Sequence, residues 1–394
     1  MRRNSLPGAI AFTPPRKIMT TLSVLGILGA VVFLVGLVAS PHRIWGGYLV
    51  AFNYLTGLGI AGGVFLAVLS MSGAAWATAL RRIPEAMTAT VPVAGLLGLV
   101  LLFGLHSLYE WSHESVVAGD PVLQGKSAYL NVPGFSLRLL LFFAVWILLL
   151  RLMVRRSQAQ DRPGVVADPK RDAAFSAVFM VVFCITFSLA SFDWLMSLEP
   201  HWFSTIFALY RLAGIGLAGM AVVIIFVVTL RRGPLRRIVT ESHLQDLGRI
   251  TMSLSVFWAY IWYCQYMLIW YTNIPEETTY YLLRGETPWN VLSRTSLVLN
   301  WLLPFLVLLP RAACRSETVL LRVAVVLLVG HALDLFLQVA PPLMGDTPAF
   351  GLWELGPLVA AVAVFFLVTL KALGTASLVP ERDPRLEQSL TYHS

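Results

Sequence analysis

Residues 212–230 read LAGIGLAGMAVVIIFVVTL, an unbroken apolar stretch without a charged side chain. A helix of about 20 apolar residues crosses the roughly 30 Å hydrocarbon core of a bilayer. Each such helix satisfies its own backbone hydrogen bonds, whereas a membrane β-barrel needs strands of alternating polarity. The stretch therefore predicts a transmembrane helix and an all-α fold.

The rest of the chain repeats this pattern. Of the 394 residues, 57% are hydrophobic and 13% are charged, whereas soluble domains usually have about 25% charged residues. The apolar runs predict an all-α integral membrane protein with about ten transmembrane helices. Their expected ranges are 18–40, 45–80, 88–108, 135–153, 173–192, 203–230, 250–272, 292–309, 318–339 and 353–373. The second run exceeds a simple span, so we expect it to tilt or to project beyond the lipid.

These runs divide the chain into three parts. Residues 1–17 form an N-terminal arm, residues 18–373 the ten-helix membrane domain, and residues 374–394 a short polar tail that we expect to be mobile. Four basic residues precede the first apolar run without a clear small-residue cleavage site. We therefore interpret this run as an uncleaved helix and not as a signal peptide.

Lysine and arginine are distributed unevenly between the two sides of the predicted bundle. All 29 lie on the side of the N-terminus except Arg43, Lys126, Arg138, Arg211, Arg284 and Arg294. Because cytoplasmic loops are enriched in these residues, both termini are predicted to be cytoplasmic, in a bacterial inner membrane. The net charge of +8 reflects this orientation, so we expect a lipid environment and no nucleic-acid partner.

The cysteines and histidines do not form the motif of a bound redox centre. Cys184, Cys264 and Cys314 lie far apart and form neither CxxC nor CxxCH, the patterns of covalent haem and of iron–sulfur sites. A b-type haem needs two histidines that face each other, and only His106 and His331 lie near predicted spans. We expect no metal site and no cofactor in this chain.

Polar side chains concentrate in one half of the predicted bundle. At 1.5 Å per residue they should lie roughly 8–12 Å below the outer surface; they are Asn53, Arg211, Gln265, Asn300, His331 and Asp334. Because polar groups are costly inside a bilayer, this layer is the candidate functional site. The other half is expected to hold mostly small and hydroxyl residues, such as Ser70, Ser72, Ser176, Thr251 and Ser253.

His331 and Asp334 are three residues apart and therefore share a helix face. A carboxylate beside an imidazole can pass a proton near neutral pH. The pair is either a proton relay that opens to the outer side, with Asp193 as a third candidate, or a structural pair at a helix contact. Arg211 does not lose its proton, so we interpret it as a buried counter-ion of Asp193, Glu199 or Asp334.

A second candidate lies where the third predicted span ends. A quinone site needs a hydrogen-bond donor, a proton acceptor and aromatic walls. His106, Tyr109 and Glu110 offer these groups. They are candidate quinone contacts or, alternatively, ordinary interfacial hydrogen-bonding residues.

Two long stretches are more specific than generic membrane sequence. They are SFDWLMSLEPHWFSTIFALY (residues 191–210) and FWAYIWYCQYMLIWYTNIPEET (residues 257–278). Both resemble the ActF family, NrfD- and PsrC-like membrane subunits of bacterial alternative complex III. The ten-span layout agrees with that family, so the resemblance extends over essentially the whole chain.

The resemblance implies an NrfD-like fold of two four-helix bundles with flanking helices. It also implies membership in a quinol:cytochrome c or quinol:oxidase oxidoreductase of the respiratory chain. The expected partners are a sister NrfD-like subunit, a multihaem cytochrome c, an iron–sulfur protein and a cytochrome oxidase. In such assemblies haem c and the iron–sulfur clusters belong to other subunits, the quinol site is better supported in the sister subunit, and proton conduction or a second quinone site is considered for ActF.

A stand-alone secondary transporter is the alternative function. Transporters favour helices broken by Gly and Pro near the middle of the membrane, and Gly57, Gly59, Gly62, Gly63 and Pro304 resemble such breaks. Small residues also permit close helix packing. The glycines and the proline by themselves therefore do not distinguish a transporter from a subunit of a respiratory complex.

Overall fold

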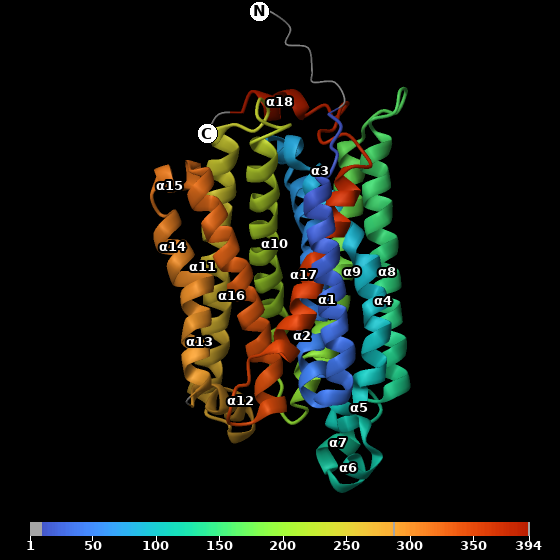
Figure 1. Cartoon of the computed structure of the whole chain (residues 1–394), viewed down its shortest axis with the longest axis vertical. Helices are drawn as coiled ribbons and strands as arrows, with labels where there is room; N and C mark the ends of the chain where they lie inside the picture. Colours follow the sequence, from blue (N-terminus) through green and yellow to red (C-terminus); the bar gives the residue numbers. More distant parts are fainter. Residues whose placement is uncertain (1–9, 287, 393–394) are drawn as a thin grey trace, which may run out of the picture.

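The computed structural model describes residues 10–286 and 288–392, and in this part of the chain every regular element is a helix (Figure 1). Within these described ranges, nine helices are long and apolar enough to cross a membrane. They are Arg16–Ala39 (α1), Pro41–Ser72 (α2), Arg82–Leu108 (α3 to α5), Val132–Ala159 (α8), Pro169–Leu198 (α9 with a terminal turn), Phe207–Arg231 (α10), Trp289–Leu308 (α13 to α14), Glu317–Met344 (α16) and Leu352–Leu373 (α17). The predicted all-α, multi-pass membrane architecture is confirmed at this level.

The predicted span at 250–272 lies within α11, Glu241–Thr272, which is not one of these nine helices. Its length of 32 residues equals that of α2. Its many Trp, Tyr and Ser residues, together with Gln265, make it less apolar than the others. Because α11 packs along α10 in the bundle (Figure 1), a tenth crossing stays a prediction.

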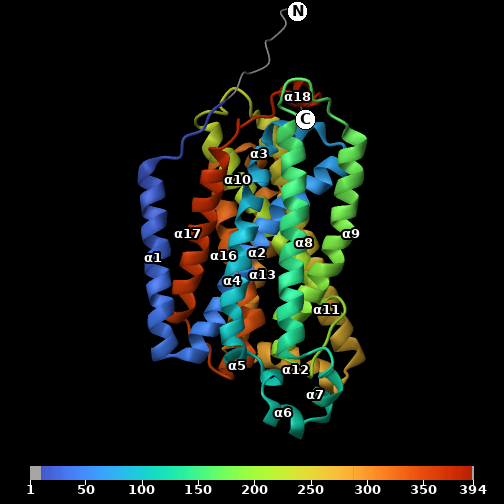
Figure 2. The same ribbon diagram turned by 90° about the vertical axis from the view of Figure 1, so that its right-hand side faces the viewer.

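The long helices form two groups and a flanking pair. Helices α2, α4, α8 and α9 contact one another, as do α10, α11, α14 and α16, while α2 and α10 join the two groups. Helices α1 and α17 pack against each other and against α2, and Figure 2 shows α1 at the edge of the bundle. Short helices α6 (Glu114–Gly119), α7 (Pro121–Lys126) and α12 (Pro275–Gly285) cover one end (Figure 1).

Aromatic packing explains part of the first long motif. The Trp194 ring stacks on Phe143 of α8, with centroids 5.8 Å apart and an interplanar angle of 12°. It also meets Phe52 of α2 edge-on at 5.0 Å. Such ring pairs add about 0.5–1.5 kcal/mol beyond the burial of their area. Trp194 therefore fixes the end of α9 between α2 and α8.

The predicted helix at 45–80 is too long. α2 ends at Ser72 because Gly73 takes a left-handed conformation with φ of 63° and caps the helix. A short 3-10 helix, Ala75–Leu80, then leads into α3 (Arg82–Met87). This break brings the 75–87 segment to the end of the bundle where the two described chain ends lie (Figure 1).

The C-terminal tail is ordered over its described residues, contrary to the expectation that it is mobile. The Leu378 amide donates to the Ile10 carbonyl at 3.0 Å, which joins the two chain ends. The short helix α18, Leu386–Leu390, packs on the 3-10 helix. There the Ser389 hydroxyl donates to the Trp76 carbonyl at 2.6 Å. Leu378 and Leu386 of the tail are buried, and this burial of apolar surface stabilises the packing of the tail against the bundle.

Candidate functional site

The candidate site lies between α10 and α16, toward the end of the bundle that α12 covers. α10 begins at Phe207, so Tyr210 and Arg211 belong to its first turns. α16 runs in the opposite sense and ends at Met344, so Asp334 lies about 15 Å from that end. The two helices pack against each other, and the Tyr210 hydroxyl on α10 reaches the Asp334 carboxylate on α16.

Asp334 is a buried carboxylate that neutral groups hold in place. The Tyr210 hydroxyl donates to Oδ1, and the Gln338 amide donates to Oδ2 at 3.1 Å. The side chain is buried, and among the described residues no salt bridge reaches it. A buried carboxyl group can take up and release a proton, and its neutral form is the less costly one to bury. Asp334 is therefore chemically suited to accept and release a proton.

His331 and Arg211 flank this carboxylate. A Cβ atom on Gly214 of α10 would lie 3.5 Å from His331 Nδ1 and 3.7 Å from Asp334 Oδ2. The two α16 side chains thus border the same point of α10, as their shared face predicted, although no hydrogen bond joins them in the described structure. His331 Nε2 and Arg211 Nε are buried without a hydrogen-bond partner. Buried polar atoms normally have a hydrogen-bond partner. Two such atoms without one, close to the Asp334 carboxylate, distinguish this region from the apolar rest of the bundle.

Arg211 does not form the predicted ion pair. Its Nη1 donates to Asn53 Oδ1 at 3.0 Å, and in the described part of the chain no salt bridge joins it to a carboxylate. Two of its expected partners pair with other arginines. Asp193 binds Arg138, and Glu199 binds Arg284.

A cavity of about 330 Å³ borders Asp334. Its walls come from α10, α11, α12, α13 and α16. Aromatic side chains dominate them: Tyr210, Trp262, Tyr266, Tyr280 and Tyr281. Polar groups also line it: Gln265, Arg284, Asn290, Ser293, Arg294, Ser296 and Gln338. The Gln338 Oε1 atom is buried and has no hydrogen-bond partner. The cavity therefore combines flat aromatic walls with polar and basic groups near a carboxylate, which suits a small molecule that carries polar groups.

Arg284 holds α12 over this cavity. Its Nε donates to the Leu337 carbonyl of α16 at 2.9 Å, and its Nη atoms contact the Glu199 carboxylate at 3.2 and 3.3 Å. The guanidinium carbon lies 3.4 Å from the centre of the Tyr280 ring. Burial, the largest effect, raises the pKa of Tyr280 to about 12. Tyr280 thus stays protonated at neutral pH and can act as a hydrogen-bond donor.

Asp193, the third predicted relay residue, belongs to a different helix pair. Its carboxylate accepts two hydrogen bonds from Arg138 of α8, at 2.7 and 3.2 Å. The side chain of Asp193 is 1% exposed, and a bidentate arginine–carboxylate pair is among the stronger side-chain contacts. The structure therefore assigns Asp193 to an ion pair between α8 and α9 and separates it from Asp334.

The predicted quinone contacts do not line the cavity. The Tyr109 hydroxyl donates to the Trp194 carbonyl at 2.8 Å, and its ring is buried against Trp111 and Phe135. The exposed His106 lies 3.1 Å from the Ser112 hydroxyl through Nδ1, and Glu110 is exposed as well. Because Tyr109 uses its hydroxyl for a backbone contact, these three residues form no common binding surface.

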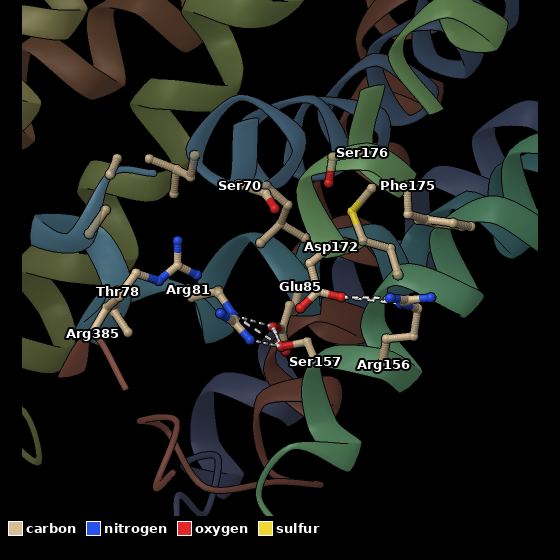
Figure 3. A pocket seen from close by; sticks show the side chains of 15 residues that line it. Ser70, Thr78, Arg81, Glu85, Arg156, Ser157, Asp172, Phe175, Ser176 and Arg385 are labelled. Atoms are coloured by element: carbon tan, nitrogen blue, oxygen red, sulfur yellow. Dashed lines mark hydrogen bonds and ion pairs between the residues drawn. The ribbon is translucent and has the colours of Figure 1, made fainter. Parts of the chain in front are cut away.

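A second polar cluster lies at the end of the bundle near the chain termini. Arg82 donates to Glu85 at 2.5 Å and also binds Asp161, and Arg81 contacts Asp383 of the tail at 2.5 Å. Figure 3 shows the adjoining pocket, in which Arg81 points toward Ser157 and Arg156 toward Asp172. The sequence placed these charged residues in loops and in the tail but did not reveal that the break after Ser72 brings them together.

Several residues of the site were absent from the sequence prediction. Gln338 follows Asp334 by one helical turn, and this spacing could have revealed it. Tyr210 directly precedes Arg211, yet nothing local shows that it faces α16. Tyr280, Tyr281 and Arg284 belong to α12, in a segment predicted as a loop. Only the tertiary fold brings them to the cavity.

The described residues hold no group of three or more His, Cys, Asp or Glu side chains that could bind a metal ion. The sequence matches no protein-family model and no curated protein. The class that the structure itself defines is a multi-pass helical membrane protein with a buried carboxylate beside an aromatic cavity.

Proposed function

We propose that this chain is an ActF-like, NrfD-type membrane subunit of a quinol-oxidising complex of the alternative complex III kind, in which Asp334 transfers protons to and from the outer aqueous side. The observation that carries the proposal is the position of Asp334, a carboxylate held by neutral donors beside a cavity of about 330 Å³. Ionisable groups within membrane helices are costly and are usually retained for proton or ion transfer.

The proposed path begins at the cavity and reaches the Asp334 carboxyl, with the Tyr210 hydroxyl as its immediate hydrogen-bond partner. His331 lies on the inner side of Asp334 along α16, near the same point of α10. Arg211 carries a fixed positive charge on the neighbouring helix α10. In this proposal Asp334 carries the proton, and His331 and Arg211 adjust its charge state.

The complex supplies the redox chemistry. Haem c and iron–sulfur clusters belong to partner subunits, namely a multihaem cytochrome c and an iron–sulfur protein, and a sister NrfD-like subunit lies alongside in the bacterial inner membrane with both termini cytoplasmic. The two groups of packed helices with the flanking pair α1 and α17 support this assignment. The aromatic walls of the cavity suit a flat quinone ring, so a second quinone-binding role rests on the same site.

Gentle solubilisation tests the assignment to a complex. A tagged copy of this chain, expressed in its own host and extracted in a mild detergent, should copurify with c-type haem absorbance and with iron. A transporter of the same topology, purified in parallel, controls for nonspecific association. Migration of this chain alone, without haem or iron, would contradict the proposal.

A secondary transporter stays the alternative because one helix is irregular. Residues Val298–Leu302 form a π-helical turn just before Pro304, and such turns occur at functional sites. The glycines of α2 do not add to this case. A Cβ atom on Gly62 would lie 2.4 Å from the Pro84 carbonyl oxygen and one on Gly59 2.4 Å from the Thr90 hydroxyl. These glycines therefore permit close packing of a continuous helix.

A further inference from the structure

A second large cavity lies on the side of the bundle, toward the end that carries the chain termini. Its volume is about 280 Å³, and it lies between the α3–α4 segment, α8 and the end of α17. Its wall carries both polar and apolar groups. Arg151, Arg155 and Gln158 of α8 are polar, as are Glu85, Thr88 and Thr375, and the Glu85 carboxylate is already paired with Arg81 and Arg82. Pro92, Ile147 and Leu150 are among the apolar groups.

The two arginines of this cavity differ from the others nearby. Arg81, Arg82 and Arg156 all pair with carboxylates. Arg151 and Arg155 have no hydrogen bond or ion pair among the residues that the structure describes, and both are exposed. They are four residues apart on one helix, so their charges repel each other. An anion between the two guanidinium groups would remove this repulsion.

The depth of these arginines matches a membrane surface. α8 begins at Val132, so Arg151 lies about 28 Å along the helix axis at 1.5 Å per residue. The hydrocarbon core is about 30 Å thick. Arg151 and Arg155 therefore lie where lipid phosphates lie, and Ile147 lies about one turn deeper.

Apolar stripes continue from the cavity toward the membrane interior on both flanking helices. Along α4 (Val91–Leu101) and the 3-10 turn that follows it (Leu102–Gly104), Pro92 is followed at helical spacing by Leu96, Leu99 and Phe103, which are 64%, 38% and 84% exposed. On α8, Ile147 is preceded on the same face by Ala144 and Leu140, both exposed. Because α4 and α8 pack against each other, the stripes run side by side below the two arginines.

We propose that this cavity binds an anionic phospholipid, with its phosphate at Arg151 and Arg155 and its acyl chains along α4 and α8. Basic pockets between membrane helices bind acidic lipid headgroups in this way. Free inorganic phosphate could satisfy the arginines, but it would leave the apolar stripes without a role. The site is separate from the Asp334 cavity and does not depend on the proposed function.

Native mass spectrometry of the full-length chain in mild detergent tests the proposal. Phosphatidylglycerol, phosphatidylcholine and inorganic phosphate are added separately to the wild type, to an Arg151→Gln/Arg155→Gln variant, and to an Arg162→Gln/Arg171→Gln control. Arg162 and Arg171 are exposed at the same end of the bundle and do not line the cavity. The control therefore removes the same charge, and thermal unfolding of each variant shows that it is folded.

Wild type and control should retain phosphatidylglycerol in preference to phosphatidylcholine. The Arg151→Gln/Arg155→Gln variant should lose about 30-fold in phosphatidylglycerol affinity, as expected for two basic groups at a membrane surface. Equal affinity in this variant and in the control would overturn the proposal. So would displacement of bound phosphatidylglycerol by millimolar inorganic phosphate, because the site would then recognise the phosphate alone.

Discussion

The Tyr210 hydroxyl on α10 donates a hydrogen bond to the Asp334 carboxylate on α16, across a separation of 124 residues in the sequence. Gln338 completes the set of neutral donors from the same helix as Asp334. The bond ties α10 to α16, two helices of the same group, at the wall of the cavity. A contact that holds a carboxylate between helices can serve both stability and proton transfer, and variants can separate the two.

Asp334→Asn should abolish proton transfer at this position and preserve the fold, because the amide keeps the size of the carboxyl group and one of its two acceptor oxygens. In the intact complex, reconstituted in vesicles, we expect proton translocation per electron to fall, with a rate loss on the order of 10²-fold for the transfer step. Asp346→Asn, in an exposed turn of the same end, is the control. An unchanged proton-to-electron ratio in Asp334→Asn excludes Asp334 as the relay group.

Tyr210→Phe should lower the free energy of unfolding by about 1–2 kcal/mol, because it leaves a buried carboxylate oxygen with one donor fewer. Tyr281→Phe is the matched control. Its ring lines the same cavity, and its hydroxyl has no hydrogen bond in the described structure. Thermal or chemical unfolding in detergent measures the difference. Equal stability of the two variants would show that the Tyr210 hydroxyl does not stabilise the fold.

Asp193→Asn should destabilise the chain more strongly, by about 3 kcal/mol, because Arg138 would remain charged at a largely buried position without its partner. A double variant, Arg138→Met/Asp193→Leu, should recover much of this loss, since apolar residues avoid the cost of desolvating the charges. The assembled complex that contains the double variant should translocate as many protons per electron as the wild-type complex. A coupling defect there would return Asp193 to the proton path.

The Asp334 cavity should be reachable by water-soluble reagents. In a background with Cys184, Cys264 and Cys314 replaced, Ser293→Cys should react quickly with a charged thiol reagent because Ser293 lines the cavity. Ser255→Cys, at a fully buried position of α11, should react slowly. Adding the reagent to one side of sealed vesicles also reports orientation, and reaction from the cytoplasmic side would contradict the predicted topology.

Asp120, in the loop that carries α7, gives a pH-dependent prediction. Desolvation acts to raise its pKa, but hydrogen bonds from His201 and from the amides of Leu123 and Val122 outweigh it and lower the pKa of Asp120. Because the folded loop favours the ionised Asp120 carboxylate, this carboxylate stabilises the loop at pH values above the usual Asp pKa of about 3.9. This stabilisation disappears as the pH falls through the lowered value.

Hydrogen exchange in residues 114–126 measures this effect. Exchange should accelerate, after correction for the intrinsic pH dependence, as the pH drops below about 3.9. In Asp120→Asn the profile should be flat over that range. The same acceleration in both proteins would show that another group controls the loop.

The sequence by itself determined the class of fold, because long apolar runs have no stable alternative to membrane-spanning helices. From the constant rise per residue it also predicted one depth for a polar layer that includes Asn53, Arg211 and Asp334, and that depth stays a prediction. The spacing of His331 and Asp334 correctly predicted a shared face. Charge partners could not be predicted in this way. Arg211 has three carboxylates near its level, and helix rotation decides which of them any arginine can reach.

Only the tertiary structure decided which polar groups meet. It paired Asp193 with Arg138, aimed Tyr210 at Asp334 and placed α12 over the cavity. It also folded the 75–87 segment and the C-terminal tail into a charged cluster that local pattern did not reveal. The physical reason is that the position of an apolar run in the sequence predicts which residues cross the membrane. The rotation of each helix and its neighbours follow from side-chain packing between distant parts of the chain.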